Sequence, residues 1–258
     1  MQFSDIGKGE AIVLLHGYFE TSEIWDSFAE KLSRDFRVIT IDLPGHGMSD
    51  SYAETHSMDY MAKTVKEIII SLDLKKIFMA GHSMGGYVTL AFVELFPELL
   101  SGFCLFHSHP FADSAEIQDK RDNEIRLVLS GRKDIIYPET VKGMYATDNL
   151  EKFRESFERS KRIASTITAG GIVAVLRGMK SRPSRVVVIE KGRIPFLWIL
   201  GTKDNFINYE QVTAKVILPA NAEVAVLENS GHMGFIEEEE KSLEILSDFL
   251  KRKVLNIN

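Results

Sequence analysis

The sequence is poor in cysteine. Cys104 is the only cysteine in 258 residues, so no disulfide can form within the chain. It lies in the apolar run Gly102–Phe106, which is typical of a buried core thiol rather than a reactive one. A chain without disulfides is typical of a reducing compartment, and we expect a cytoplasmic protein.

Long hydrophobic runs and excess positive charge are absent as well. The longest strongly apolar stretch is the seven residues Ile194–Leu200, whereas a membrane-spanning helix needs about 20. Residues 1–10 contain Asp5, Lys8 and Glu10 and lack the apolar segment of a secretory signal. The formal net charge of −6 argues against general nucleic-acid binding. We expect neither a membrane nor a nucleic acid as a partner, and the oligomeric state stays open.

Motifs for metals and nucleotides are missing too. The chain has no His-Glu-x-x-His pattern, no paired cysteines, no P-loop and no Gly-x-Gly-x-x-Gly run. The pair of glycines in Gly7-Lys8-Gly9 predicts only a short turn between strands. We therefore expect no metal and no cofactor.

Strand-like and helix-like runs alternate along most of the chain. Strands are predicted at 11–15, 37–41, 76–80, 102–106, 195–200 and 222–227, and helices at 23–32, 58–72, 84–96 and 237–250. This alternation predicts an α/β fold with a mostly parallel central sheet flanked by helices on both faces. The acidic run Glu237–Glu240 suits the first turn of its helix, and we expect no further role for it.

The alternation is interrupted between residues 113 and 193. Helices are predicted there at 117–128, 138–145 and 150–168, and Gly170-Gly171 predicts a bend. We therefore expect a core in two parts, residues 1–112 and 194–258, with residues 113–193 inserted as a helical cap.

The inserted segment differs from the rest of the chain in charge. Residues 114–193 carry 17 Lys and Arg and 11 Asp and Glu, whereas the remainder carries 14 and 26. A basic insertion could attract an anionic substrate or carrier. It could equally be solvated surface that is attracted to the acidic core.

The strongest local signal is Gly81-His82-Ser83-Met84-Gly85, a Gly-x-Ser-x-Gly pattern. A strand-like run precedes it and a helix-like run follows, and this is the context in which such a serine is held exposed on a sharp turn. A serine hydroxyl is a weak nucleophile without a base, so a histidine and an orienting acid are expected further along the chain.

His232 and Asp204 are the best candidates for that base and acid. His232 follows the strand predicted at 222–227, and Asp204 follows the strand predicted at 195–200, so both should lie with Ser83 beyond the carboxyl ends of parallel strands. Asp113 is a rival for the acid, because it follows the preceding strand, predicted at 102–106, from which the acid could also come.

Five stretches together resemble the α/β-hydrolase superfamily, in its capped and esterase-like form. They are Val13–Gly17, Asp42–Ser49, Gly81–Gly86, Gly201–Asp204 and Gly231-His232. The resemblance implies that Ser83, Asp204 and His232 form a catalytic triad and that the backbone amides of Tyr18 and Met84 form the oxyanion hole. It implies hydrolysis of a small carboxylic ester through an acyl-enzyme on Ser83. It also implies structural roles for His16 and His46.

Several alternatives share these residues. A carbon–carbon bond hydrolase or a lactonase would use the same triad, a cofactor-free peroxidase is a further possibility, and the fold also serves as a ligand receptor. The menaquinone-pathway lyases carry an arginine where this chain has Tyr87, which argues against that activity.

The remaining histidines and the insertion complete the expectations. His107 and His109 follow a strand end and are candidates for lining the pocket, whereas His82 should point away from Ser83. The insertion should supply apolar pocket walls without supporting the geometry of the triad. Candidates for these walls are Ile117, Ile125, Leu129, Phe153, Phe157 and Ile172.

Overall fold

The computed structural model describes residues 1–50 and 53–255. A seven-stranded sheet has the order β1-β3-β2-β4-β5-β6-β7. Its strands are β1 (Phe3–Gly7), β2 (Ala11–Leu15), β3 (Arg37–Ile41), β4 (Ile77–His82), β5 (Leu100–Phe106), β6 (Phe196–Gly201) and β7 (Ala222–Leu227). Strand β1 is antiparallel to β3, and the other neighbours are parallel. The predicted α/β class with a mostly parallel sheet is confirmed.

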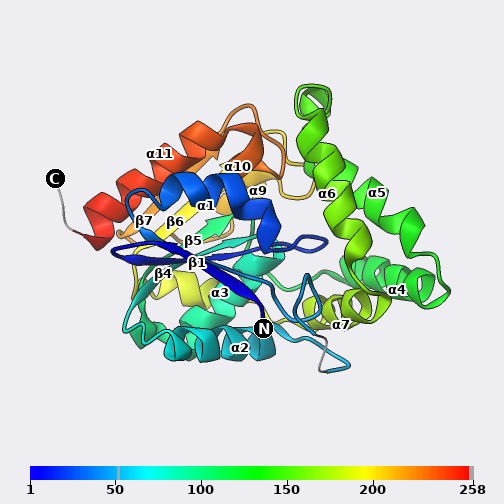
Figure 1. The fold of residues 1–258 in the computed structure, drawn as a ribbon, viewed down its shortest axis with the longest axis horizontal. Helices are drawn as coiled ribbons and strands as arrows, with labels where there is room; N and C mark the ends of the chain where they lie inside the picture. The colour runs from blue at the N-terminus through cyan, green and yellow to red at the C-terminus, as the bar shows by residue number, and fades with distance from the viewer. Residues whose placement is uncertain (51–52, 256–258) are drawn as a thin grey trace.

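Helices cover both faces of the sheet (Figure 1). The helices α2 (Met58–Ser71) and α3 (Met84–Leu95) pack side by side on one face. On the other face lie α1 (Asp26–Leu32), α10 (Gly234–Glu237) and α11 (Glu239–Phe249). Because helices cover both sides, the central strands β2, β4 and β6 are buried along their whole length, which explains their continuous apolar sequences.

The chain between β5 and β6 is helical. It contains α4 (Ala115–Leu129), α5 (Lys133–Met144), α6 (Arg154–Thr166), α7 (Ala169–Lys180) and the short α8 (Val186–Glu190). Helices α4 to α7 project beyond one edge of the sheet (Figure 1), where α4 packs on α7 and α5 packs on α6. We refer to residues 113–193 as the helical insertion.

Several local predictions were wrong. Strand β1 was not predicted, because as a largely exposed edge strand it has no apolar run. The short helices α8 and α9 (Tyr209–Thr213) were missed. Gly170-Gly171 forms the first turn of α7 rather than a bend. A Cβ atom on Gly171 would lie 2.1 Å from the carbonyl oxygen of Gly45, so this glycine is needed for close packing of α7.

Among the described residues, no helix is long and apolar enough to cross a membrane.

Within the insertion, the expected pocket residues differ in burial. Leu129 is 67% exposed, whereas Ile172 is fully buried. The exposure of Leu129 argues against its expected place in a pocket wall.

Candidate active site

The sharp turn at Ser83 joins β4 to α3. Ser83 has φ 50° and ψ −111°, a backbone conformation that side chains rarely adopt, and it stands directly before the first turn of α3. Its amide donates to the carbonyl oxygen of Phe106 at 2.9 Å, and its carbonyl oxygen accepts from Ser108 Oγ at 2.7 Å. The turn is thus held by the neighbouring strand β5 and the residues after it.

Two glycines make this turn possible. A Cβ atom on Gly81 would lie 2.2 Å from the carbonyl oxygen of Gly85, and one on Gly85 would lie 2.5 Å from the carbonyl oxygen of Leu15. Any side chain at either position would force the strand and the helix apart. The glycines of the Gly-x-Ser-x-Gly pattern are therefore required by close backbone contacts.

Asp204 and His232 are joined by a hydrogen bond. His232 Nδ1 lies 2.7 Å from Asp204 Oδ2, and both side chains are almost completely buried. Asp204 Oδ1 accepts from the amides of Phe206 at 2.8 Å and Ile207 at 3.0 Å, which fixes the carboxylate. This pairing matches the predicted base and acid.

The electrostatics of the pair favour charge on both partners. Burial alone would raise the pKa of Asp204, but His232 and His107 outweigh it and lower that pKa. Burial alone would lower the pKa of His232, but the charge of Asp204 and its hydrogen bond raise it. Asp204 is therefore a carboxylate at neutral pH and stabilises a protonated His232.

His107 is a second partner of Asp204. Its Nδ1 lies 3.3 Å from Asp204 Oδ2, and its Nε2 accepts from the amide of Gly234 at 3.2 Å. Because Nε2 is an acceptor, Nδ1 carries the proton and donates to the carboxylate. Burial lowers the pKa of His107 to about 4, so this imidazole is neutral. His107 was a candidate for lining the pocket, and its ring contacts the carboxylate of Asp204.

The same three side chains are the one group of potential metal ligands among the described residues. Ligand atoms of His107, Asp204 and His232 lie within 4.8 Å of one another. Hydrogen bonds already account for this proximity, since both histidines face one carboxylate oxygen. The expectation that no metal is bound stays a prediction.

His82 was expected to point away from Ser83, and its ring contacts Glu20 and the backbone of His232. Its Nε2 lies 2.8 Å from the backbone oxygen of His232, and its Nδ1 lies 2.8 Å from Glu20 Oε2. Glu20 Oε2 also accepts from the amide of Gly17 at 2.5 Å. His82 and Glu20 thus connect the loop after β2 to the loop that carries His232. Because His82 directly precedes Ser83, both loops contact the strand end that leads into Ser83.

The two backbone amides expected to form an oxyanion hole are free. Among the described residues, neither the amide of Tyr18 nor that of Met84 donates a hydrogen bond. The Met84 amide stands at the N-terminus of α3, where helix amides lack partners within the helix. Tyr18 follows Gly17, whose amide is fixed by Glu20. Both amides are available for an external acceptor.

Asp113, the rival acid, lies elsewhere. Its carboxylate pairs with the guanidinium groups of Arg121 and Arg182. It has no hydrogen bond to His232, which is paired with Asp204 instead. The geometry therefore favours Asp204 over Asp113.

Glu237 is a site residue that the sequence did not indicate. It is 5% exposed and accepts from the amides of Gly231 at 2.7 Å and Ala146 at 2.8 Å. The acidic run that contains it was expected to have no role beyond its helix. That interpretation was wrong for Glu237, because tertiary packing buries it between the His232 loop and the helical insertion.

His16 begins the loop after β2, and His46 lies in the loop after β3. His16 Nε2 accepts from the amide of Leu43 at 2.9 Å, and its Nδ1 lies 2.8 Å from the oxygen of Gly17. The rings of His16 and His46 pack with their centres 5.0 Å apart. Both side chains are buried and connect loops, in keeping with a structural role.

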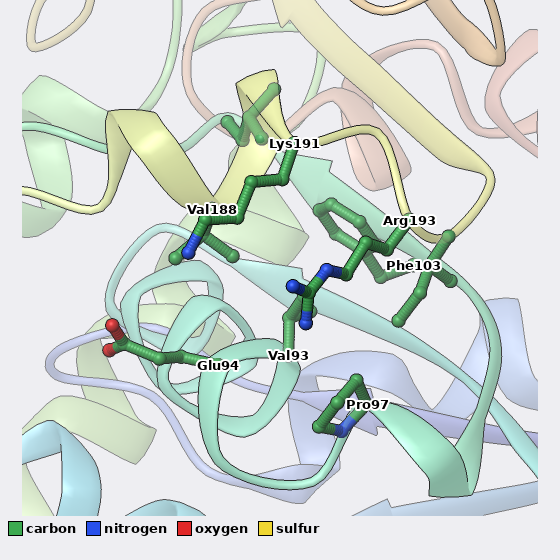
Figure 2. Close-up of a pocket in the computed structure, with 9 residues that line it drawn as sticks. Val93, Glu94, Pro97, Phe103, Val188, Lys191 and Arg193 are labelled. Atoms are coloured by element: carbon green, nitrogen blue, oxygen red, sulfur yellow. The ribbon is translucent and has the colours of Figure 1, made fainter.

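A separate pocket lies at the other end of α3. Figure 2 shows Lys191 and Arg193 reaching over Val93 and Glu94, with Phe103 and Pro97 beside them. These residues belong to the last turn of α3, to the turn that follows it at Pro97, to β5 and to the segment after α8. The pocket includes neither Ser83 nor His232, so it is not part of the candidate active site.

Comparison with known proteins agrees with the fold and the turn at Ser83. A model of the family described as the alpha/beta hydrolase fold matches residues 10–124. An esterase from Thermogutta terrifontis, solved with malate bound, superposes with a TM-score of 0.94 at 26% identity, over 98% of this chain and 93% of its own.

Two curated relatives match part of the chain. An uncharacterised protein of Mycobacterium tuberculosis is 36% identical over 103 residues, or 40% of this chain and 30% of the relative. A 2-hydroxy-6-oxononadienedioate/2-hydroxy-6-oxononatrienedioate hydrolase of Escherichia coli is 38% identical over 104 residues, or 38% of this chain and 36% of the relative. Each match thus spans only about a third of the relative. Together with the sheet order, the comparisons show that the chain has the α/β-hydrolase fold.

Proposed function

We propose that this protein is a serine hydrolase that cleaves a small carboxylic ester through an acyl-enzyme on Ser83. The observation that carries the proposal is the hydrogen bond of 2.7 Å between His232 and Asp204, next to a serine held on a strained turn. The esterase of Thermogutta terrifontis, which matches over nearly the whole chain, supports an ester as substrate.

The first chemical step transfers a proton from Ser83 to His232. The hydroxyl of Ser83 attacks the ester carbonyl, and His232 Nε2 takes its proton. Nδ1 of His232 donates to Asp204, so Nε2 is the free acceptor in the neutral ring. The lowered pKa of Asp204 keeps a negative charge beside the imidazolium that forms.

The negative charge on the carbonyl oxygen is received by the amides of Tyr18 and Met84. Neither amide is used within the described part of the protein, so binding the oxyanion breaks no existing bond. His232 then gives its proton to the leaving alcohol. In the second half of the reaction His232 activates a water molecule, which hydrolyses the acyl-enzyme and frees Ser83.

Labelling and turnover together test this proposal. A fluorophosphonate should label the wild-type protein at Ser83, and Ser83→Ala should lose both labelling and ester hydrolysis. Losses on the order of a millionfold follow removal of such a serine in an efficient enzyme. Labelling that persists in a folded Ser83→Ala protein would assign the nucleophile to another residue.

Cleavage of a carbon–carbon bond is the second candidate function. The relative from Escherichia coli is named as a hydrolase of an oxo-dienedioate, and its match of 38% identity favours this alternative. Each of these reactions would use the same triad, so only the substrate distinguishes them. The experiment is a panel that contains activated esters of graded acyl length, a lactone and a ring-cleavage dienoate. Steady turnover of any of them excludes a receptor that only retains its ligand.

A further inference from the structure

A cluster of charged side chains is buried where the helical insertion meets the core. Asp113 pairs with Arg121 of α4 and with Arg182, which follows α7. Two arginines against one aspartate leave one positive charge without a counter-charge. Glu124 lies near Arg121, but burial raises the pKa of Glu124 and so disfavours its charged form. Two arginines thus face one paired carboxylate and one carboxyl group whose charged form is disfavoured by burial.

One edge of the Arg182 guanidinium group has no partner. The side chain is 5% exposed, and its Nη1 donates to the oxygen of Met179 at 2.8 Å and to Asp113 Oδ1 at 2.6 Å. Nε and Nη2 are buried and have no hydrogen-bond partner among the described residues. These two N–H groups form the fork that binds both oxygens of a carboxylate. Buried donors without partners are costly, so the free edge points to a ligand.

The contacts of Arg182 connect this edge to Ser83. Its guanidinium group lies 3.8 Å from the ring centre of Tyr87, which stands one turn after Ser83 on α3. The Tyr87 hydroxyl lies 3.3 Å from His109 Nε2. Burial, with the nearby charges of Arg182 and His232 among its further causes, lowers the pKa of His109 to about 3. His109 is therefore close enough to both Arg182 and His232 to interact with each electrostatically.

Tyr18 connects the cluster to the oxyanion side of Ser83. Its hydroxyl is buried and has no partner within the described part of the chain. Burial raises the pKa of Tyr18, and both Glu124 and Arg121 of α4 act on it electrostatically. The side chain of Tyr18 therefore faces α4, while its amide remains free beside the Ser83 turn.

We propose that Arg182 binds a carboxylate group of the substrate through Nε and Nη2 while the ester carbonyl of the same molecule lies at Ser83. The inference rests on the proposed function and narrows its substrate class to carboxylate-bearing esters. The bound carboxylate satisfies both free donors of Arg182 and adds a negative charge beside two arginines. The Tyr18 hydroxyl, which faces the same cluster, is a further donor for a polar substrate.

The test compares charged and neutral esters of matched size. The 4-nitrophenyl half-ester of glutaric acid is compared with 4-nitrophenyl valerate, which places the carboxylate on the acyl side. Butyrate esters of 4-hydroxybenzoate and of phenol place it on the alcohol side. We expect wild-type kcat/KM to favour the charged ester of one pair, and the favoured pair identifies the side that Arg182 binds.

Variants of Arg182 then assign the preference. Arg182→Gln and Arg182→Lys should reduce the ratio of charged to neutral kcat/KM by about 10- to 100-fold, as for hydrogen bonds to a charged group. Arg182→Lys keeps a cation near Asp113 and covers the case in which Arg182→Gln does not fold. Arg185→Gln is the matched control. Arg185 is equally buried but donates from Nε and Nη2 to Glu94 and Asp59, so the ratio should not change.

Binding without turnover separates this inference from the proposed function. In calorimetry, glutarate should bind to Ser83→Ala protein and lose affinity in the double variant Ser83→Ala/Arg182→Gln, whereas glutaramide should bind to neither. Binding of glutarate without any ester turnover in the wild type would uphold the carboxylate site and reject the esterase. Ester turnover with equal ratios in wild type and Arg182→Lys would overturn the carboxylate site alone.

Discussion

At the scale of single residues, Asp204 is held from four directions. Its two oxygens accept from the amides of Phe206 and Ile207 and from the rings of His232 and His107. The neutral His107 donates its Nδ1 proton and adds no full charge. Asp204 thus stays ionised and correctly oriented, and its negative charge acts mainly on His232.

The first prediction concerns the pH dependence set by this pair. His232 must be neutral to accept a proton, so wild-type activity should fall as pH drops through a pKa above the ordinary 6.5. Asp204→Asn should lower kcat by about 10⁴-fold. It should also move the acid limb to lower pH, because burial then lowers the pKa of His232 without the charge of Asp204 to oppose it. The measurement is kcat/KM against pH, with Asp148→Asn at an exposed ion pair as control. An unmoved limb would assign that limb to another group.

Glu20 and His82 form a buried pair that requires charge. Both ring nitrogens of His82 lie 2.8 Å from oxygen atoms, one of Glu20 and one of the His232 backbone. Burial alone would raise the pKa of Glu20, but His82 outweighs it and lowers that pKa. The pair contributes stability above the ordinary carboxyl pKa of about 4.3, and this contribution is lost as pH falls through the lowered value.

The second prediction is the effect of breaking this pair. Glu20→Gln removes the buried carboxylate that His82 and the Gly17 amide contact and should lower the free energy of unfolding by about 3 to 5 kcal/mol at pH 7. The difference from wild type should shrink at low pH, where Glu20 is protonated. Urea denaturation at pH 7 and pH 4 measures both effects. Glu223→Gln, which breaks an ion pair between exposed side chains, should cost less than about 1 kcal/mol. Equal costs for the two variants would contradict a charged buried pair.

Single residues also show what the sequence can predict. Ser83, Asp204 and His232 follow strand ends, and their chemistry is readable from residue type and order. Glu20, His82 and Glu237 have ordinary local contexts, and only tertiary packing buries them against the site. No local signal distinguishes such residues from solvated surface charges.

At the scale of secondary-structure elements, apolar runs predicted all strands of the parallel part of the sheet, including β4, which leads into Ser83. The exposed edge strand β1 and the close contact of Gly171 with Gly45 could not be predicted, because each depends on a partner distant in sequence. The predictable elements are those that position the candidate triad.

The third prediction concerns the short helix α10, which carries Glu237. Glu237→Gln places an amide group against one of the backbone N–H groups of Gly231 and Ala146, so one hydrogen bond is lost. The His232 loop should loosen, and kcat should fall on the order of 10- to 100-fold through misplacement of the base. Hydrogen exchange at the Gly231 amide should accelerate. Glu240→Gln, at an exposed position of the same acidic run, should leave both readouts unchanged. Unchanged kcat in Glu237→Gln would show that the loop is fixed by other contacts.

At the scale of the whole molecule, the helical insertion and the core are joined at the site. The amide of His232 donates to the oxygen of Met144 at 2.7 Å, and Glu237 binds the amide of Ala146. Residues 144–146 thus contact the His232 loop directly, which weighs against the expectation that the triad does not depend on the insertion. That expectation stays a prediction. Sequence patterns could place the insertion between two strands but could not show which of its residues return to the core.

The last prediction follows from this connection. Replacing residues 113–193 with a short linker removes Met144, which accepts from the His232 amide, and Ala146, whose amide donates to Glu237. Fluorophosphonate labelling of Ser83 should therefore slow on the order of 100-fold. If the insertion acts on the loop through Glu237, Glu237→Gln should slow labelling in the full-length protein and add little in the shortened one, since two changes on one pathway are not additive. Circular dichroism and thermal unfolding confirm that each variant is folded. Full additivity of the two changes, or unimpaired labelling of the shortened protein, would mean that the core alone sets the position of His232 and that the insertion acts only on substrate choice.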